Sequence, residues 1–405
     1  MTWQPPSPET LVRQLQPEGV GRGELELVVR EQFGSAVLRG NELVLPNDWT
    51  NYALKITYDE ERIQSISAGP VLTEDTLASI IRTLREDVAA PGGIGVGNTI
   101  LFSHGIAAKG WWKYRDRFQI LPAPAQAPMP DWVVTGGNPF MLECRFPGCH
   151  HAEVRGLRKA IAEQRIVLLL HTFLRGSITP HDSMTQFHWV RLPSENSDMN
   201  IAYCQTMYTF NGLQRQLPDF SSTEQLPPLK RIASTEYYNP RRASEDSTLD
   251  LPDHLERLLD AFFTLPEAAQ DRFLRASYWL RHSHVVHSSS KSAGYIALVQ
   301  AIESLLGKTG QTCGECGQPR ERTTRRFAAF LATYVPGDAM NRNARSALYA
   351  IRSAITHGEY LFDTDRFPVM AMLDPAGVRG LDLGWTMRRL TQQALIGWLL
   401  SQTKA

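Results

Sequence analysis

The segment RNARSALYAIRSAITHGEYL, residues 342–361, carries the clearest helical pattern in the chain. Apolar residues recur in it at intervals of three and four, which places them on one face of a helix. These residues are Ala347, Leu348, Ile351, Ala354 and Ile355. Gly358 follows where a helix commonly ends, because glycine adopts the left-handed backbone conformation without strain. We therefore predict one amphipathic helix that ends near Gly358.

Two side chains of this segment suggest chemistry, Arg352 and His357, spaced as Arg-x4-His. Five residues of regular helix turn by about 500°, so the two side chains point roughly 140° apart. They can approach each other if His357 lies at the fraying end of the helix. Alternatively, a second copy of the helix across a twofold axis brings an arginine and a histidine together, because an isologous dimer presents the same patch twice.

Length and composition indicate an ordinary globular protein. The 405 residues are enough for two domains, and 42% of them are hydrophobic and 21% charged. The formal net charge of zero makes no overall electrostatic case for nucleic acid. Five cysteines are too few for a disulfide scaffold, the first residues do not resemble a signal peptide, and no apolar run approaches the roughly 18 residues of a membrane span. We expect a cytoplasmic protein with no membrane partner.

The first half predicts a mixed α+β domain over residues 1–245, whose role stays open but is consistent with sensing or regulation. After an irregular arm at 1–18, we expect helices at 73–88, with Thr73 as N-cap, and at 152–174. Alternation predicts strands that include Leu25, Leu27 and Val29, and further strands at 43–45, 53–58, 62–69 and 189–210. The glycine cluster at 90–98 lacks the G-x-G-x-x-G spacing, so we expect a hairpin or surface loop there, followed by an exposed connection at 99–132.

The second half predicts an all-α helical bundle over residues 246–405, after a segment rich in proline, serine and charge. Helical periodicity occurs at 251–263, 266–283, 294–306, 320–334, 345–358 and 385–401. Within this half, His282, His284 and His287 are spaced so that they fall on different faces of a helix, and we expect surface histidines.

The cysteines suggest a possible structural zinc site. Cys313 and Cys316 form a Cys-x-x-Cys knuckle between two predicted helices, but no second Cys-x-x-Cys pair lies nearby. Cys144 and Cys149, more than 160 residues earlier, are the candidates that would complete four sulfur ligands. Two unrelated thiol pairs, or a turn without a metal, are the alternatives.

Positive charge gathers in the predicted bundle. Residues 308–352 hold eight Lys or Arg against three Asp or Glu. Arg345 precedes Arg352 by seven residues, close to two helical turns, so the two share a face. This arrangement, together with Arg325 and Arg326, is either a solvated helix face or a patch that binds RNA phosphates.

The second half also resembles a known family. A helix with YIALVQAIESLL (295–306), a Cys-x-x-Cys loop, a helix with RRFAAFL (325–331), and then IRSAITHG (351–358) follow one another in the order of a HEPN domain, closest to the Apea-like group. The resemblance covers roughly residues 255–400. It implies a metal-independent endoribonuclease that dimerises so that two Arg-x4-6-His motifs face one RNA strand. Ser353 stands where the family often has Asn, Asp or His after the arginine.

By this resemblance Arg352 and His357 are the catalytic pair, and catalysis needs no cofactor. Histidine titrates near neutral pH and can act as acid or base, whereas arginine stays charged and grips phosphate. Ser353 and Thr356 can orient either group, and Glu303 on a facing helix can hold Arg352. The implied biology is anti-phage defence or a toxin-like role. Alternatively, the ion pair of Arg352 is structural and the module binds nucleic acid, nucleotide or a protein partner without catalysis.

Overall fold

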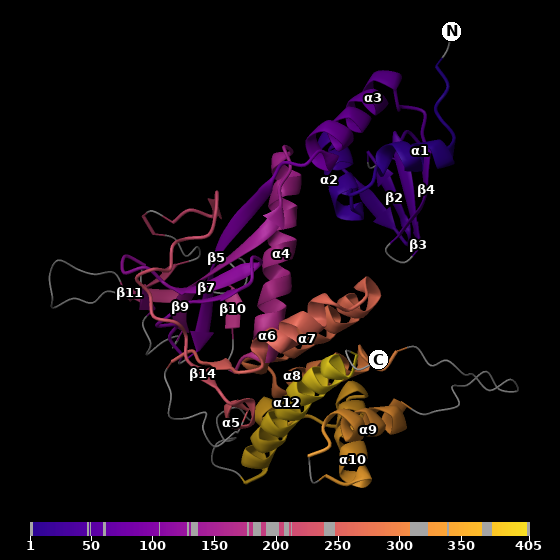
Figure 1. Cartoon of the computed structure of the whole chain (residues 1–405). Coiled ribbons are helices and arrows are strands. Elements are labelled where there is room, and N and C mark those ends of the chain that lie inside the picture. The colour runs from indigo at the N-terminus through magenta and orange to yellow at the C-terminus, as the bar shows by residue number, and fades with distance from the viewer. Residues whose placement is uncertain are drawn as a thin grey trace, which may run out of the picture.

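A computed structural model describes residues 3–402, except 47, 49, 60–61, 105, 128, 131–136, 176–177, 181–187, 192–201, 206–209, 212, 239–247, 308–322, 338–339 and 367–374. The chain folds into an α/β N-terminal region with antiparallel sheets, and helices dominate the C-terminal half. In Figure 1 a small unit that contains β2, β3 and β4 lies at one end, the long helix α4 (Ala152–Phe173) stands in the middle, and the C-terminal helices lie at the other end.

The first unit is a four-stranded antiparallel sheet covered by helices. Its strands run in the order β1 (Val37–Arg39), β2 (Glu42–Leu45), β3 (Leu54–Asp59) and β4 (Arg62–Ala68). The helices are α1 (Pro8–Leu15), α2 (Arg22–Phe33), α3 (Glu74–Arg82) and the π-helical turn η1 (Thr83–Ala89). Their apolar sides share one core, in which Leu11, Leu25, Ile56 and Leu84 are fully buried. The predicted N-cap is confirmed, because the Thr73 hydroxyl accepts a hydrogen bond from the N–H of Thr76 at 3.2 Å.

Two predictions for this unit are wrong. Residues 8–15 form a helix within the stretch predicted as an irregular arm, and residues 22–33 form a helix instead of a strand. In α2 the buried residues are Leu25, Val28 and Val29, a spacing of three and four from Leu25 that matches a helix. The alternation of Leu25, Leu27 and Val29 is therefore a coincidence of the sequence. The carboxylate of Glu24 accepts a hydrogen bond from the N–H of Gly21 at 3.0 Å, which stabilises the first turn.

The second sheet is larger and antiparallel throughout. Its strands run in the order β10 (Ile178–Pro180), β5 (Ile94–His104), β9 (Gly137–Pro147), β7 (Phe118–Pro122) and β6 (Trp112–Tyr114), and β13 (Gln216–Leu217) also pairs with β5. Two smaller groups follow: β12 (Ala202–Gln205), β11 (His188–Arg191) and β8 (Met129–Pro130), and the parallel pair β14 (Arg231–Ile232) and β15 (Leu251–Pro252). The strands predicted within residues 189–210 are thus present among the described residues.

The loops that the sequence predicts at 90–98 and 99–132 are wrong, because residues of both ranges form strands of this sheet. Gly95 pairs with Phe146 and Gly97 with Cys144 in the ladder between β5 and β9. Glycine is a poor strand former, but this eleven-residue pairing outweighs that local preference. The ladder is invisible in the sequence because its two strands lie more than 30 residues apart.

The predicted helix at 152–174 is confirmed as α4, which packs against one face of the second sheet. The C-terminal helices also agree with the prediction: α6 (Leu255–Phe263), α7 (Glu267–His287), α8 (Lys291–Glu303), α9 (Thr323–Tyr334), α10 (Arg342–Thr356) and α12 (Pro375–Gln402). Two short helices, α5 (Ser234–Tyr237) and α11 (Asp363–Arg366), complete the described set.

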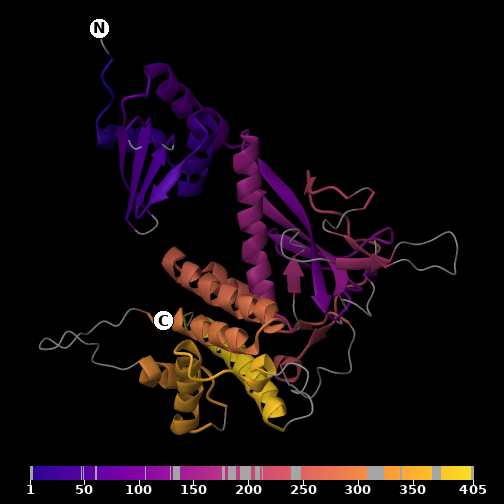
Figure 2. The same cartoon turned by 180° about the vertical axis from the view of Figure 1, so that it is seen from behind.

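One hydrophobic core runs from the second sheet through α4 into the C-terminal helices. It includes Leu142 of β9, Phe173 of α4 and Phe273 of α7, and the ring centroids of the two phenylalanines lie 6.0 Å apart. The side chain of Gln392 on α12 donates to the carbonyl oxygens of Thr172 at 2.9 Å and Leu174 at 3.2 Å. Figure 2 shows α12 beside α7 and below the end of α4. The division of the chain near residue 245 stays a prediction.

Candidate active site and other functional surfaces

The predicted catalytic residues lie at the C-terminal end of α10. Asn341 caps its start by accepting from the N–H of Ala344 at 2.9 Å, and Leu348 and Ile355 bury its apolar face. Gly358 has φ of +77°, and its N–H donates to the carbonyl of Ile355 at 3.1 Å. The predicted glycine stop is therefore confirmed, and it leaves His357 as the first residue beyond the helix.

Arg352 is tied to the neighbouring helix α8. Its guanidinium lies 3.3 Å from the carboxylate of Glu303, which also accepts a hydrogen bond from the hydroxyl of Tyr349 at 2.8 Å. Burial and this hydrogen bond raise the pKa of Tyr349. The side chains of Arg352 and Glu303 each keep 23% of their surface exposed, so the pair is fixed but open to solvent.

His357 and its neighbours reach the surface to different degrees. His357 and Thr356 are exposed, and Ser353 is half-buried. The hydroxyl of Thr356 donates to the carbonyl of Arg352 at 2.8 Å, so it satisfies the backbone instead of pointing toward a ligand. Across the described residues no hydrogen bond or ion pair joins Arg352 to His357. The structure thus brings Glu303 and Arg352 together. His357 lies at the exposed C-terminal end of the same helix.

The three other arginines have different surroundings. Arg326 donates to the carbonyl oxygens of Leu306 and Gly307, the latter at 3.0 Å. These hydrogen bonds join α9 to the residues that directly follow α8. Arg325 is exposed on α9, and Arg345 is half-buried on α10. Of the three, Arg325 is therefore the most accessible to a ligand, and Arg326 has a structural role.

The zinc prediction falls partly outside the described residues, because Cys313 and Cys316 lie in the segment 308–322. Cys144 is buried beneath α4, where burial raises the pKa of its thiol to about 12. Cys149 is buried in the core of the first unit, and burial raises its pKa as well. Because the two thiols are buried in separate hydrophobic cores, they do not fit a shared site. Among the residues that the structure describes, no three His, Cys, Asp or Glu side chains gather to hold a metal. A structural zinc stays a prediction.

The histidines of α7 form part of a basic cluster that the sequence did not predict. His284 and His287 are half-buried instead of lying on the surface. Arg388 of α12 donates to Nδ1 of His284 at 2.8 Å, and the ring of His284 lies 6.2 Å from the ring of the buried His171. Burial, followed by the charge of Arg388, holds the pKa of His171 well below its usual value. Burial, followed by the charge of Lys291, lowers the pKa of His287 to about 4.

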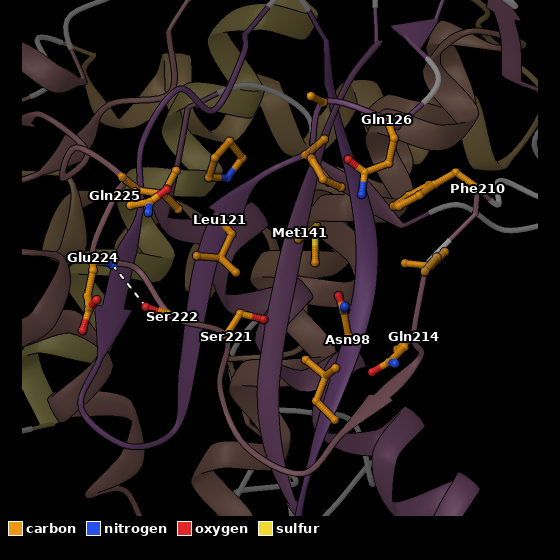
Figure 3. A pocket seen from close by; sticks show the side chains of 17 residues that line it. Asn98, Leu121, Gln126, Met141, Phe210, Gln214, Ser221, Ser222, Glu224 and Gln225 are labelled. Carbon is orange, nitrogen blue, oxygen red and sulfur yellow. Dashed lines mark hydrogen bonds between the residues drawn. The ribbon is translucent and has the colours of Figure 1, made fainter.

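A pocket of about 630 Å³ lies on the face of the second sheet opposite α4 (Figure 3). Leu121, Met141 and Asn98 point into it from the strands, and Phe210 and Gln214 approach from a later segment. The side chain of Asn98 is 3% exposed, and its carbonyl oxygen has no hydrogen-bond partner among the described residues. The lining is apolar and uncharged polar apart from Glu224, which suits an uncharged ligand. None of the predicted site residues lies in this pocket.

No helix within the described residues is both long enough and apolar enough to cross a membrane. Comparisons with family models, curated proteins and solved structures gave no match. The resemblance to HEPN domains therefore stays a prediction that depends on the residues of this chain.

Proposed function

We propose that the protein is a metal-independent endoribonuclease of the HEPN type, in which Arg352 and His357 act on RNA. The observation that carries the proposal is that an anchored guanidinium and an exposed imidazole both lie near the end of one helix. Glu303 fixes Arg352 while leaving part of it accessible, and Gly358 ends the helix so that His357 faces solvent. By family resemblance, the biological role would be anti-phage defence or a toxin-like activity.

The reaction requires no metal. The 2′-oxygen of a ribose attacks the adjacent phosphorus, and an imidazole accepts the 2′-hydroxyl proton. The P–O5′ bond then breaks, and O5′ takes up a proton from an imidazolium, which leaves a 2′,3′-cyclic phosphate and a 5′-hydroxyl. Arg352 would bind the phosphoryl oxygens, where negative charge accumulates in the transition state.

We propose that two copies of the C-terminal helices form one site in a homodimer. Side chains five residues apart on a helix diverge by about 140°, so one copy presents its arginine and its histidine in different directions. A second copy across a twofold axis supplies the complementary pair. Apolar surface lies beside His357, because Tyr360 is 41% exposed and Leu361 is 47% exposed. Covering this surface would favour association.

Cleavage of labelled RNA in the presence of a chelator tests the proposal. We expect His357→Asn and Arg352→Gln each to reduce the rate by about 100-fold or more, because the first removes an acid–base group and the second a cation that stabilises the transition state. His150→Asn, which changes an exposed histidine near α4, is the matched control and should cleave at the wild-type rate. Unchanged cleavage by both site variants would refute the assignment.

Mixing the two inactive variants tests the composite site. A dimer that contains one Arg352→Gln chain and one His357→Asn chain regains one intact arginine and one intact histidine at the interface. We therefore expect the mixture to recover part of the wild-type rate. A mixture as inactive as its two components would contradict the shared site while leaving the single-chain assignment testable.

A second candidate is a non-catalytic HEPN module that binds nucleic acid, a nucleotide or a protein partner. The ion pair between Glu303 and Arg352 favours it, because a guanidinium engaged with a carboxylate also serves to join two helices. RNA binding with no cleavage, in wild-type protein with or without added Mg²⁺, would select this candidate.

A further inference from the structure

A groove of about 1050 Å³ is lined by residues that are distant in sequence from the proposed catalytic pair. Residues of the first unit, of the second sheet, of α4 and of the last residue of α6 line it. In both views α10 lies at the opposite end of the molecule from the first unit (Figures 1 and 2). Five arginines line the groove: Arg115, Arg117, Arg145, Arg158 and Arg165.

Three of these arginines are neutralised by carboxylates. The pairs are Arg158 with Glu24 at 2.6 Å, Arg145 with Asp116 at 2.9 Å and with Asp219 at 3.0 Å, and Arg115 with Asp260 at 2.5 Å. Such pairs hold the groove together but offer little net charge to a ligand.

Arg117 and Arg165 differ from the other three. Neither forms an ion pair with a carboxylate in the part of the chain that the structure describes. Arg165 donates from Nη2 to the neutral side chain of Gln270, and its buried Nε has no partner among the described residues. Arg117 is exposed on the turn between β6 and β7. The groove therefore contains two arginines without a direct carboxylate partner among the described residues, although the charges of Asp271 and Glu267 act on Arg165 from a distance.

The two guanidiniums contact the same aromatic ring. The Cζ atom of Arg117 lies 4.2 Å from the ring centroid of Phe263, and that of Arg165 lies 5.5 Å from it. The two like charges repel each other, and the repulsion is stronger in a half-buried site than in water. Accordingly, burial and the charge of Arg117 both lower the pKa of Arg165. An anion bound near both guanidiniums would offset this repulsion.

The same groove has an apolar part. Ile94, at the start of β5, is 62% exposed, and Ile161 on α4 is 57% exposed, and both line the groove. Together they give the groove an apolar surface that a ligand could cover. A ligand that suits the whole groove thus carries both an anionic group and an apolar group.

We propose that this groove binds a nucleotide, with its phosphate between Arg117 and Arg165 and its base against Ile94 and Ile161. Arginine forks match phosphate oxygens, and the apolar face of a base can pack against aliphatic side chains such as those of Ile94 and Ile161. The nucleotide is either free or part of an RNA strand, because both present the same phosphate and base. The site is separate from Arg352 and His357 and does not depend on cleavage.

Calorimetric titration of the full chain tests the proposal, with AMP, ATP, adenosine, inorganic phosphate and a short single-stranded RNA as probes. The His357→Asn background slows the proposed cleavage of the RNA and separates this result from the proposed catalysis. We expect AMP, ATP or the RNA to bind, and adenosine, which lacks a phosphate, to bind at least tenfold more weakly. Tight AMP binding identifies a free nucleotide, whereas binding of the RNA alone identifies a strand.

Arg117→Gln and Arg165→Gln should each weaken binding by about tenfold or more. Arg275→Gln removes an exposed charge on α7 outside the groove and should leave binding unchanged. Without ligand, Arg117→Gln should be at least as stable to urea as the parent protein, because it removes a repulsive charge. Binding that is absent for every nucleotide and RNA probe, or that is insensitive to both groove substitutions, would overturn the proposal.

Discussion

The guanidinium of Arg352 on α10 lies 3.3 Å from the carboxylate of Glu303 on α8. Tyr349, one turn earlier on α10, donates to the other oxygen of the same carboxylate at 2.8 Å. One acidic side chain therefore holds two residues of α10, which restricts the directions in which Arg352 can reach. This anchoring distinguishes Arg352 from the exposed Arg325 on α9.

Glu303→Gln should lower the free energy of unfolding by about 1 kcal/mol, because the ion pair is partly exposed and solvent screens it. In the proposed nuclease it should also slow cleavage less than Arg352→Gln does, since Glu303 only positions the guanidinium. Urea denaturation and the RNA assay measure the two effects. Tyr349→Phe removes one hydrogen bond and keeps the ion pair, and it serves as the control. A loss of stability above about 3 kcal/mol would instead indicate a deeply buried pair.

Replacing either of two helical glycines with alanine should change the stability of the protein, in opposite directions. A Cβ atom at Gly397 on α12 would lie 2.4 Å from the backbone oxygen of Tyr334, so Gly397→Ala forces α12 away from α9. We expect a loss of stability of about 1–3 kcal/mol, the usual cost of overpacking. Gly156 on α4 has no atom within 4 Å of such a Cβ, so Gly156→Ala should gain about 0.5–1 kcal/mol from helix propensity. Thermal unfolding of both variants tests this, and equal changes would show that the packing of α12 against α9 is looser than the structure indicates.

Stability should fall as the pH decreases from about 7.5 to 5. An unfolded histidine titrates near pH 6.5, whereas the pKa of folded His171 lies well below that value. The unfolded state then binds more protons in this window, so stabilisation is complete above it and is lost on acidification. The buried ring should contribute up to about 1.4 kcal/mol per pH unit. His171→Gln cannot titrate, and its urea midpoint should vary less with pH. Identical slopes for the two proteins would disprove this role.

Local signals predicted the elements that are determined locally. The apolar stripe and glycine stop of α10, and the threonine cap of α3, involve residues within a few positions of one another. The missed β5 depends on its distant partner β9, and the misread α2 contains a short alternation that fits both a strand and a helix. The error at β5 therefore arose from a distant partner, and the error at α2 from a local pattern that fits two conformations.

The same distinction applies to the candidate sites. The Arg352 and His357 motif is visible because it lies within one helix, and the pairing with Glu303 followed from the family resemblance. The arginines that meet at Phe263 come from α4 and the turn before β7, and nothing in the sequence relates them. Asn98 was hidden within a segment that reads as a glycine-rich loop. A residue far away in sequence completes each of these missed sites.

The two ends of the helix α4 contact different parts of the protein. Near its start Arg158 binds Glu24 of the first unit, and at its end the carbonyl of Thr172 accepts from Gln392 of the C-terminal helices. One helix therefore carries contacts to both the first unit and the C-terminal helices. A chain without residues 1–150 would lose Glu24, and the guanidinium of Arg158 would then lack this carboxylate while the other end of α4 kept its bond to Gln392.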